Sequence, residues 1–242
     1  NDDITVTFTI TPKLAGCSSG PVQIANVVVE PTPSVVVVNN VPTICDGGTP
    51  DFDITSLTVP SIPANLTFDI AVSLPPGVSG TGIAGSGVNG VAAPFSFNAG
   101  TLTNAATSSR TVVYTITPKL NGCANGASQV VNVVVEPTPQ VSLTNNLAKI
   151  CNNGTPNITV TSTTAPSIPG NLTFDVVVTL PGGVSGTGIA GNGAVGQTAP
   201  FSINAGTLTN TNSAFATVTY TVTPKLLGCA DGPSQQVDVI IE

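Results

Sequence analysis

Short stretches of alternating hydrophobic and polar residues follow one another along the chain, and this pattern predicts β-strands. The period of two is clear in Leu66–Leu74, where Phe68, Ile70 and Val72 would share one face. No stretch of about 11 residues has the 3.6-residue period of a helix. Within residues 31–136 the pattern predicts seven strands: Ser34–Asn40, Asp51–Val59, Leu66–Leu74, a short strand inside Pro75–Gly90, Phe95–Leu102, Thr111–Pro118 and Gln129–Val135.

This strand pattern occurs twice in full. Residues 31–136 and 137–242 align without a gap, and 65 of 106 aligned positions are identical. Each unit is long enough to bury its own core, and short strands with Gly and Pro turns are typical of an antiparallel sandwich. The sequence therefore predicts an all-β fold of immunoglobulin-like β-sandwich domains in tandem, at 31–136 and 137–242. Semi-rigid linkers that hold neighbouring domains in line are predicted at Pro31-Thr32-Pro33 and Pro137-Thr138-Pro139.

Residues 1–30 match only the last two strands of a unit. A two-stranded ribbon is marginally stable by itself. We interpret it as the C-terminal strands of a preceding, incomplete repeat. A hairpin donated to another chain, which would make the protein a polymerising subunit, is the alternative.

Charge and composition exclude several classes of function. Charged residues make up 7% of the chain, the formal net charge is −7, and the five basic residues form no patch for nucleic acid. No run of about 18 apolar residues predicts a membrane span. The chain has no His, and no pair of carboxylates recurs at a fixed position in the two units. We therefore expect that the chain is not an enzyme and that it has no cofactor and no catalytic residue.

Three other patterns have structural interpretations. Asp46, Asp51 and Asp53 could suggest calcium, but the second unit has no carboxylate at the equivalent positions, so we predict a surface turn and no metal. Gly77–Gly87 lacks the lysine and following helix of a phosphate loop, so we predict a tight loop with an edge strand. Tyr114 and Tyr220 lie mid-strand and should pack in the cores with bonded hydroxyls.

Five cysteines occupy two fixed positions, with Cys17, Cys123 and Cys229 at one and Cys45 and Cys151 at the other. Their spacing does not suit zinc and favours disulfides, hence an oxidising, extracytoplasmic compartment. In a seven-strand sandwich, Cys45 would lie at the trailing end of its unit, which faces the next unit. Cys123 would lie at the leading end, which faces the preceding one.

A strand of seven residues spans about 23 Å, whereas a disulfide needs Cα atoms within about 7 Å. We therefore favour an inter-domain bond between Cys45 and Cys229, with Cys17 and Cys123 pairing upstream and Cys151 downstream. Intra-domain pairs, Cys45–Cys123 and Cys151–Cys229, stay open as the alternative because they use the cysteines of each full unit.

The two cysteine motifs, taken together, resemble a known family of repeats. These motifs are Ile44-Cys45-x-Gly47-Gly48-Thr49 and, after the strand that leads to Pro118, Asn121-Gly122-Cys123, closed by a Val-rich strand and Pro-Thr-Pro. The combination resembles the PKD-like and immunoglobulin-like repeats of very large Bacteroidota surface proteins, such as gliding-motility adhesins of the SprB type. The resemblance covers the whole chain. It implies export by the type IX secretion system and display on the cell surface as long filaments.

These features together predict structural stalk repeats of a long extracellular adhesin or cell-surface filament. The partners expected are neighbouring repeats of the same chain or filament, while the sequence identifies no surface or polysaccharide target. A glycan- or protein-binding β-sandwich module is a further alternative, alongside the strand-donating subunit.

Overall fold

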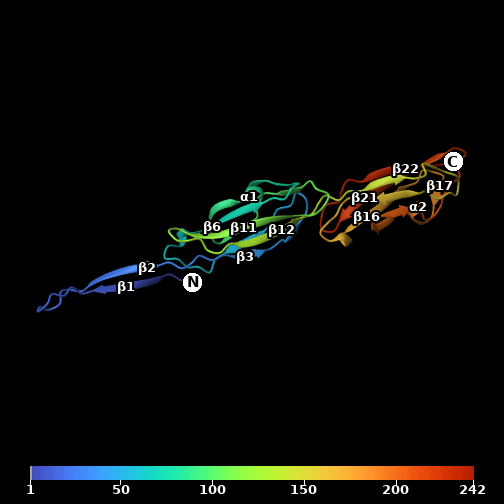
Figure 1. Ribbon diagram of the computed structural model, residues 1–242. Coiled ribbons are helices and arrows are strands. Elements are labelled where there is room, and N and C mark those ends of the chain that lie inside the picture. The colour runs from blue at the N-terminus through green and yellow to red at the C-terminus, as the bar shows by residue number, and fades with distance from the viewer. Residues whose placement is uncertain (1) are drawn as a thin grey trace.

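Three bodies follow one another in an elongated row in the computed structural model, which describes residues 2–242 (Figure 1). A two-stranded ribbon comes first, and two β-sandwich units follow it. The strands of the units fall between residues 36 and 135 and between residues 142 and 241. No helix in this part of the chain has the length and apolar character that crossing a membrane requires.

The first unit contains a five-stranded sheet in the order β4-β12-β11-β6-β8, a three-stranded sheet β3-β5-β9 and a two-stranded pair β10-β7. All pairings are antiparallel except the short parallel pair β4–β12. The elements are β3 (Val36–Asn39), β4 (Thr43–Ile44), β5 (Phe52–Thr55), β6 (Leu66–Ser73), β7 (Val78–Gly80), α1 (Gly82–Ser86), β8 (Val88–Ala92), β9 (Phe95–Phe97), β10 (Leu102–Asn104), β11 (Arg110–Leu120) and β12 (Gln129–Val135), with a 3-10 turn at Pro63–Asn65.

The core of this unit lies between the two larger sheets. Phe52 and Phe97 come from the three-stranded sheet and stack with ring centroids 4.4 Å apart. Tyr114 of β11 packs against both rings from the opposite sheet. Because successive side chains of a strand point to opposite faces, the alternating pattern of β6 and β11 places one set of residues in this core. Every buried residue of the cluster belongs to the unit itself, from Val35 to Val135.

The second unit repeats this topology, with sheets β14-β22-β21-β16-β18, β13-β15-β19 and β17-β20. Its core again lies between the sheets, around Phe174 and Tyr220. Its elements are β13 (Ser142–Asn145), β14 (Lys149–Ile150), β15 (Ile158–Thr161), β16 (Leu172–Thr179), β17 (Val184–Gly186), α2 (Gly188–Asn192), β18 (Ala194–Gln197), β19 (Phe201–Ile203), β20 (Leu208–Asn210), β21 (Ala216–Leu226) and β22 (Gln235–Ile241), with a 3-10 turn at Pro169–Asn171.

The predicted all-β antiparallel fold is confirmed, but several predicted strands have other bounds. The strand predicted at Phe95–Leu102 is wrong, because β9 and β10 are separate and belong to different sheets. The strand predicted at Asp51–Val59 ends at Thr55. The glycine-rich stretch contains the one-turn helix α1 as well as β7, and five residues are too few for a helical period to show.

The strand predicted to end at Pro118 runs on to Leu120. The Asn121 N–H donates to Asn65 O on the β6 side, and backbone groups of alternate residues point the same way. The backbone nitrogen of Pro118, which carries no hydrogen, therefore faces β12 and not β6. There the pairing with β12 has already ended at Ile116, so the proline interrupts no ladder.

The two tyrosines pack in the cores with hydrogen-bonded hydroxyls, as predicted, and the partners of these hydroxyls lie in the short helices. Tyr114 Oη donates to Ala84 O at 2.8 Å, and Tyr220 Oη donates to Ala190 O at 2.6 Å. Both rings are fully buried, and burial raises the pKa of both phenols. The tyrosine at this position therefore anchors the glycine-rich stretch of each unit.

The ribbon consists of β1 (Ile4–Ile10) and β2 (Gln23–Val29), paired antiparallel. It corresponds to β11 and β12 by the 106-residue spacing. Phe8 is 52% exposed, whereas Tyr114 at the same position of the first unit is fully buried. The apolar residues that form a core face in a complete unit are thus exposed on both strands of the ribbon.

The joint between the two units as candidate functional site

A disulfide joins the two units. Cys45 of the first unit is bonded to Cys229 of the second, with Cα atoms 5.6 Å apart and a sequence separation of 184. Of the two pairings that the sequence left open, the structure therefore contains the inter-domain one. Among the residues that the structure describes, Cys17, Cys123 and Cys151 are free and exposed.

Strand direction explains why Cys45 meets Cys229 and not Cys123. Cys45 follows β4, which runs parallel to β12 and leaves the unit at its trailing end. Cys123 follows β11, which runs in the opposite direction and finishes at the leading end. In the second unit Cys229 follows β21 in the same way, and its N–H closes a tight turn onto Leu226 O at 2.9 Å. That turn places Cys229 at the end of the second unit that faces the first.

Glu136 forms a second connection beside the disulfide. The parallel pairing of β4 and β12 continues to Glu136, whose N–H donates to Ile44 O at 2.8 Å. Its carboxylate accepts the Ser167 N–H, at 3.0 Å for Oε2, and also the Ser167 hydroxyl. Glu136 is only 6% exposed. A carboxylate that accepts two donors across the joint fixes the second unit against the first more firmly than a surface pair would.

Asp46 connects the first unit to the linker. Thr138 Oγ1, in the Pro-Thr-Pro segment, donates to Asp46 Oδ2 at 2.6 Å. The other oxygen, Oδ1, accepts the Asn104 N–H at 2.8 Å. Asp46 lies in a turn, as predicted, and its carboxylate also bridges the linker and the trailing-end loop. Within residues 2–242 no three side chains gather to hold a metal ion.

Backbone contacts complete the joint. The Ser109 N–H donates to Ala165 O at 2.9 Å, and the Ala165 N–H donates to Thr107 O at 2.8 Å. The loop that makes these contacts is held by Asn104, which is 3% exposed and whose amide donates to Ser108 O and Val135 O. A buried, fully used side chain of this kind fixes the loop before the neighbouring unit meets it.

Glycine is required where the linker crosses the second unit. A Cβ on Gly232 would overlap Pro139 O, and a Cβ on Gly126 would overlap Pro33 O in the first unit. Backbone atoms cannot move aside as a flexible side chain does. The glycine at this position therefore allows the Pro-Thr-Pro linker to lie directly on the unit that follows it.

The ribbon meets the first unit through the same contacts. Glu30 accepts the Ser61 N–H at 3.1 Å and the Ser61 hydroxyl, as Glu136 does from Ser167. The Asp3 N–H donates to Val59 O at 3.2 Å, as the Ser109 N–H does to Ala165 O. Both joints are thus built from equivalent positions, although the ribbon contains no cysteine equivalent to Cys45.

The lysine of the repeated Thr-Pro-Lys-Leu segment stabilises each unit next to the joint. Lys225 Nζ lies 2.8 Å from Asp175 Oδ2, and Lys119 pairs with Asp69. The hydrogen bond from Lys225 lowers the pKa of Asp175, and Asp175 in turn raises the pKa of Lys225. Lys119 lowers the pKa of Asp69 in the same way. These exposed pairs connect β16 to β21 and β6 to β11, so their role is within the unit.

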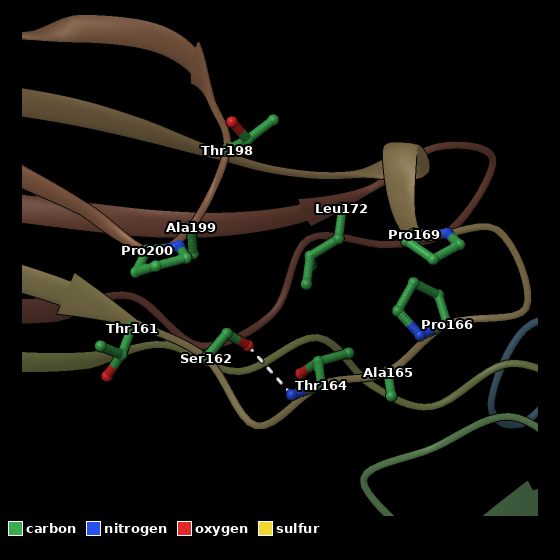
Figure 2. A pocket seen from close by; sticks show the side chains of 10 residues that line it. All are labelled: Thr161, Ser162, Thr164, Ala165, Pro166, Pro169, Leu172, Thr198, Ala199 and Pro200. Atoms are coloured by element: carbon green, nitrogen blue, oxygen red, sulfur yellow. Dashed lines mark hydrogen bonds between the residues drawn. The ribbon is translucent and has the colours of Figure 1, made fainter.

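A groove beside the joint is the other hollow of interest. Its volume is about 490 Å³, and it is lined by Thr161, Ser162, Thr164, Ala165, Pro166, Pro169, Leu172, Thr198, Ala199 and Pro200 (Figure 2). The first unit has an equivalent groove of about 360 Å³.

Hydrogen bonds of the fold already occupy the Ser162 and Thr164 hydroxyls in this groove. The Thr164 N–H donates to Ser162 Oγ at 3.0 Å, the dashed line in Figure 2. Ser162 Oγ donates to Gln140 O, and Thr164 Oγ1 accepts the Gln140 N–H. Among residues 2–242, no charged side chain lines the groove. Its polar groups hold the start of β13, and prolines and alanines supply most of its remaining wall.

The structure brings together two of the five predicted site residues, Cys45 and Cys229, and leaves the other cysteines exposed. Sequence reasoning missed Glu136, Ser167 and Asn104 as parts of the joint. A signal for the first existed, because glutamate recurs at 30, 136 and 242, the last position of each unit. The partner serine recurs as well, at 61 and 167, but recurrence alone does not reveal which residues contact each other.

Comparison with known proteins finds one family model and several solved structures that are similar to the chain. A search of the curated proteins finds no sequence that matches the chain. Solved structures that resemble it include the Escherichia coli adhesin FdeC (16% identity, TM-score 0.46, 98% of this chain and 74% of that chain), the Yersinia pseudotuberculosis adhesin InvE (15%, 0.31, 87% and 60%) and fibronectin(III)-like modules of Clostridium thermocellum CbhA (14%, 0.30, 86% and 94%). The model of the PKD-like domain family matches residues 43–139, which include most of the first unit.

Proposed function

We propose that the chain forms structural stalk repeats of a long extracellular adhesin or cell-surface filament. One observation carries this proposal: the trailing end of one unit is joined to the leading end of the next by a disulfide between Cys45 and Cys229. The hydrogen bonds of Glu136 and Asp46 lie beside it. A joint with a disulfide, charge-assisted hydrogen bonds and backbone hydrogen bonds holds successive units at a fixed angle, which is what a stalk requires.

An oxidising compartment agrees with this role. Disulfides persist outside the cytoplasm, and an exposed cross-link between two surface loops needs such conditions to survive. The resemblance to Bacteroidota surface repeats supports the finer proposal of type IX secretion and a part in adhesion or gliding motility. Under this proposal the partners are neighbouring repeats, and the target surface or polysaccharide is contacted elsewhere on the filament.

The exposed ribbon bears on the strand-donating alternative. Its apolar faces need a cover, and a donated hairpin would find one in a sandwich that lacks its last two strands. Both units of this chain already contain that hairpin, as β11–β12 and β21–β22. The ribbon also occupies the leading end of the first unit through Glu30 and Asp3, where the terminal hairpin of a preceding unit would lie. These contacts favour a remnant of a preceding repeat.

The binding-module alternative is supported by the groove of Figure 2, because both units have it. Thr198 lies at its exposed rim. If the groove binds a glycan or a peptide, Thr198→Trp should abolish saturable binding of the chain to its target. If the chain is a stalk repeat, the wild type should show no saturable binding. Thr198→Trp should then leave the stability of the chain and the inter-unit joint unchanged.

Immunogold labelling of intact cells that produce the protein tests the stalk. Antibodies raised against residues 1–242 should label material outside the cell, at intervals along filaments that extend from the surface. Label that appears only after the cells are permeabilised would contradict the proposal. Label confined to the cell envelope, with no extended filaments, would also contradict it.

A further inference from the structure

We infer that the trailing end of the second unit is a docking surface for the leading end of the first unit of another copy of this chain, which it holds through Cys151 and Glu242. The inference rests on the proposed stalk function and names the partner of a surface that is exposed in this chain. Cys151 is a free, exposed thiol, and Glu242 is exposed beside it.

The surface has the same backbone geometry as the end of the first unit that is already engaged. The Gly154 N–H donates to Cys151 O at 2.8 Å, and the Gly48 N–H donates to Cys45 O at 2.9 Å. The Glu242 N–H donates to Ile150 O as the Glu136 N–H does to Ile44 O. The Cys151 turn and the backbone of Glu242 are therefore placed as they are at the joint, and the Glu242 carboxylate, which pairs with Lys149 Nζ at 2.6 Å, lies at the same surface.

The loop beside Cys151 is also held in its docking conformation. The Asn210 amide donates to Ala214 O, and its N–H donates to Asn152 Oδ1 at 2.8 Å. These bonds match those of Asn104 in the first unit. Phe215 occupies the position of Ser109, whose backbone pairs with the next unit, and it is 70% exposed.

The opposite half of the joint is free at the leading end of the first unit. Cys123 closes its turn onto Leu120 O at 2.9 Å, the same distance that Cys229 makes to Leu226 O. Cys123 is exposed and free. A second copy whose ribbon has been removed should therefore dock its leading end on Cys151.

A truncated chain of residues 31–242 provides the test, because the core of the first unit contains no ribbon residue. At about 1 mM, the effective concentration that a short linker provides, it should form head-to-tail polymers in a glutathione redox buffer. Peptide mapping should identify a Cys151–Cys123 cross-link. The full chain of residues 1–242 is the matched control and should form no such ladder, because the ribbon occupies Ser61 and Val59.

Two variants separate docking from random oxidation. Cys151→Ser should abolish the ladder, and Glu242→Ala should slow its formation at least about tenfold, because it removes charge-assisted hydrogen bonds to Ser61. An absence of cross-links, or Cys151–Cys151 and Cys123–Cys123 dimers as abundant as the mixed pair, would overturn the inference. Neither outcome would change the result expected from immunogold labelling. The docking inference and the stalk proposal can therefore be refuted independently.

Discussion

The inter-unit disulfide should determine how far the chain extends under tension. Tension applied at the two ends reaches Cys45 from one side and Cys229 from the other, and the cross-link carries it directly between them. The residues between the two cysteines, which include nearly all of both cores, then bear no tension. Cys229→Ser, or reduction of the wild type, removes this covalent cross-link, so that both units bear the force.

The expected change in length follows from the size of the loop. The disulfide spans 184 residues, which correspond to about 640 Å of extended chain at about 3.5 Å per residue. The residues outside the loop give only about 200 Å. The same cross-link restricts the unfolded chain, and the loop-entropy relation gives a stabilisation of about 5 kcal/mol for a loop of this size.

Single-molecule force spectroscopy on residues 1–242, attached at both ends, measures this directly. Oxidised wild-type protein should reach full extension after release of the ribbon, the first strands of the first unit and β22. Cys229→Ser should show two further unfolding events, one for each unit, which together add about 640 Å. The oxidised protein measured again in the presence of reductant should behave as the variant does.

Equal extension of oxidised wild type and Cys229→Ser would refute the reasoning. The intra-domain pairing would give a different record, because a Cys45–Cys123 bond hides only about 270 Å. In that case reductant would release two separate gains of this size. The gain in extended length therefore distinguishes the two disulfide connectivities. It also tests whether the inter-unit disulfide carries the tension.

Three further predictions concern the joint and the cores. Glu136→Ala should lower the equilibrium constant for the inter-unit disulfide in a glutathione buffer about tenfold or more, because it removes hydrogen bonds to a charged group, whereas Glu242→Ala should leave it unchanged. Gly232→Ala should lower the same constant because its Cβ overlaps the linker, while Gly170→Ala, with open space around it, should not. Tyr114→Phe should reduce stability in urea by about 1 kcal/mol through loss of a buried hydrogen bond, and an unchanged midpoint would contradict the assigned bond.

The limits of the sequence prediction appear most clearly at Asp46. The second unit has Asn152 at the equivalent position, and the loss of the carboxylate indicated a surface turn and not a calcium site. The structure shows that the inner oxygen has the same role in both units, since Asp46 Oδ1 and Asn152 Oδ1 both accept a loop N–H. The outer oxygen of Asp46 binds Thr138 of the linker. Comparison of repeats could not reveal that contact, because it belongs to the joint.

The glycine-rich stretch shows a different limit. Its sequence contains no hydrophobic period, so neither the one-turn helix α1 nor its partner could be read from it. The helix is held by the Tyr114 hydroxyl, thirty residues further along the chain. The prediction that this hydroxyl has a partner followed from the cost of burying it unpaired, but the identity of the partner depended on how the strands pack.

The sequence by itself determined the repeat, the strand pattern and the buried faces, because these depend on periods of two residues and on turns that are local. It also narrowed the choice between disulfide pairings, because strand direction places Cys45 and Cys123 at opposite ends of the first unit. The tertiary structure alone decided the joint. The bonds of Glu136 with Ser167 and of Asp46 with Thr138 link positions far apart in sequence. They depend on how two complete units lie against each other, and no local pattern in the chain records that arrangement.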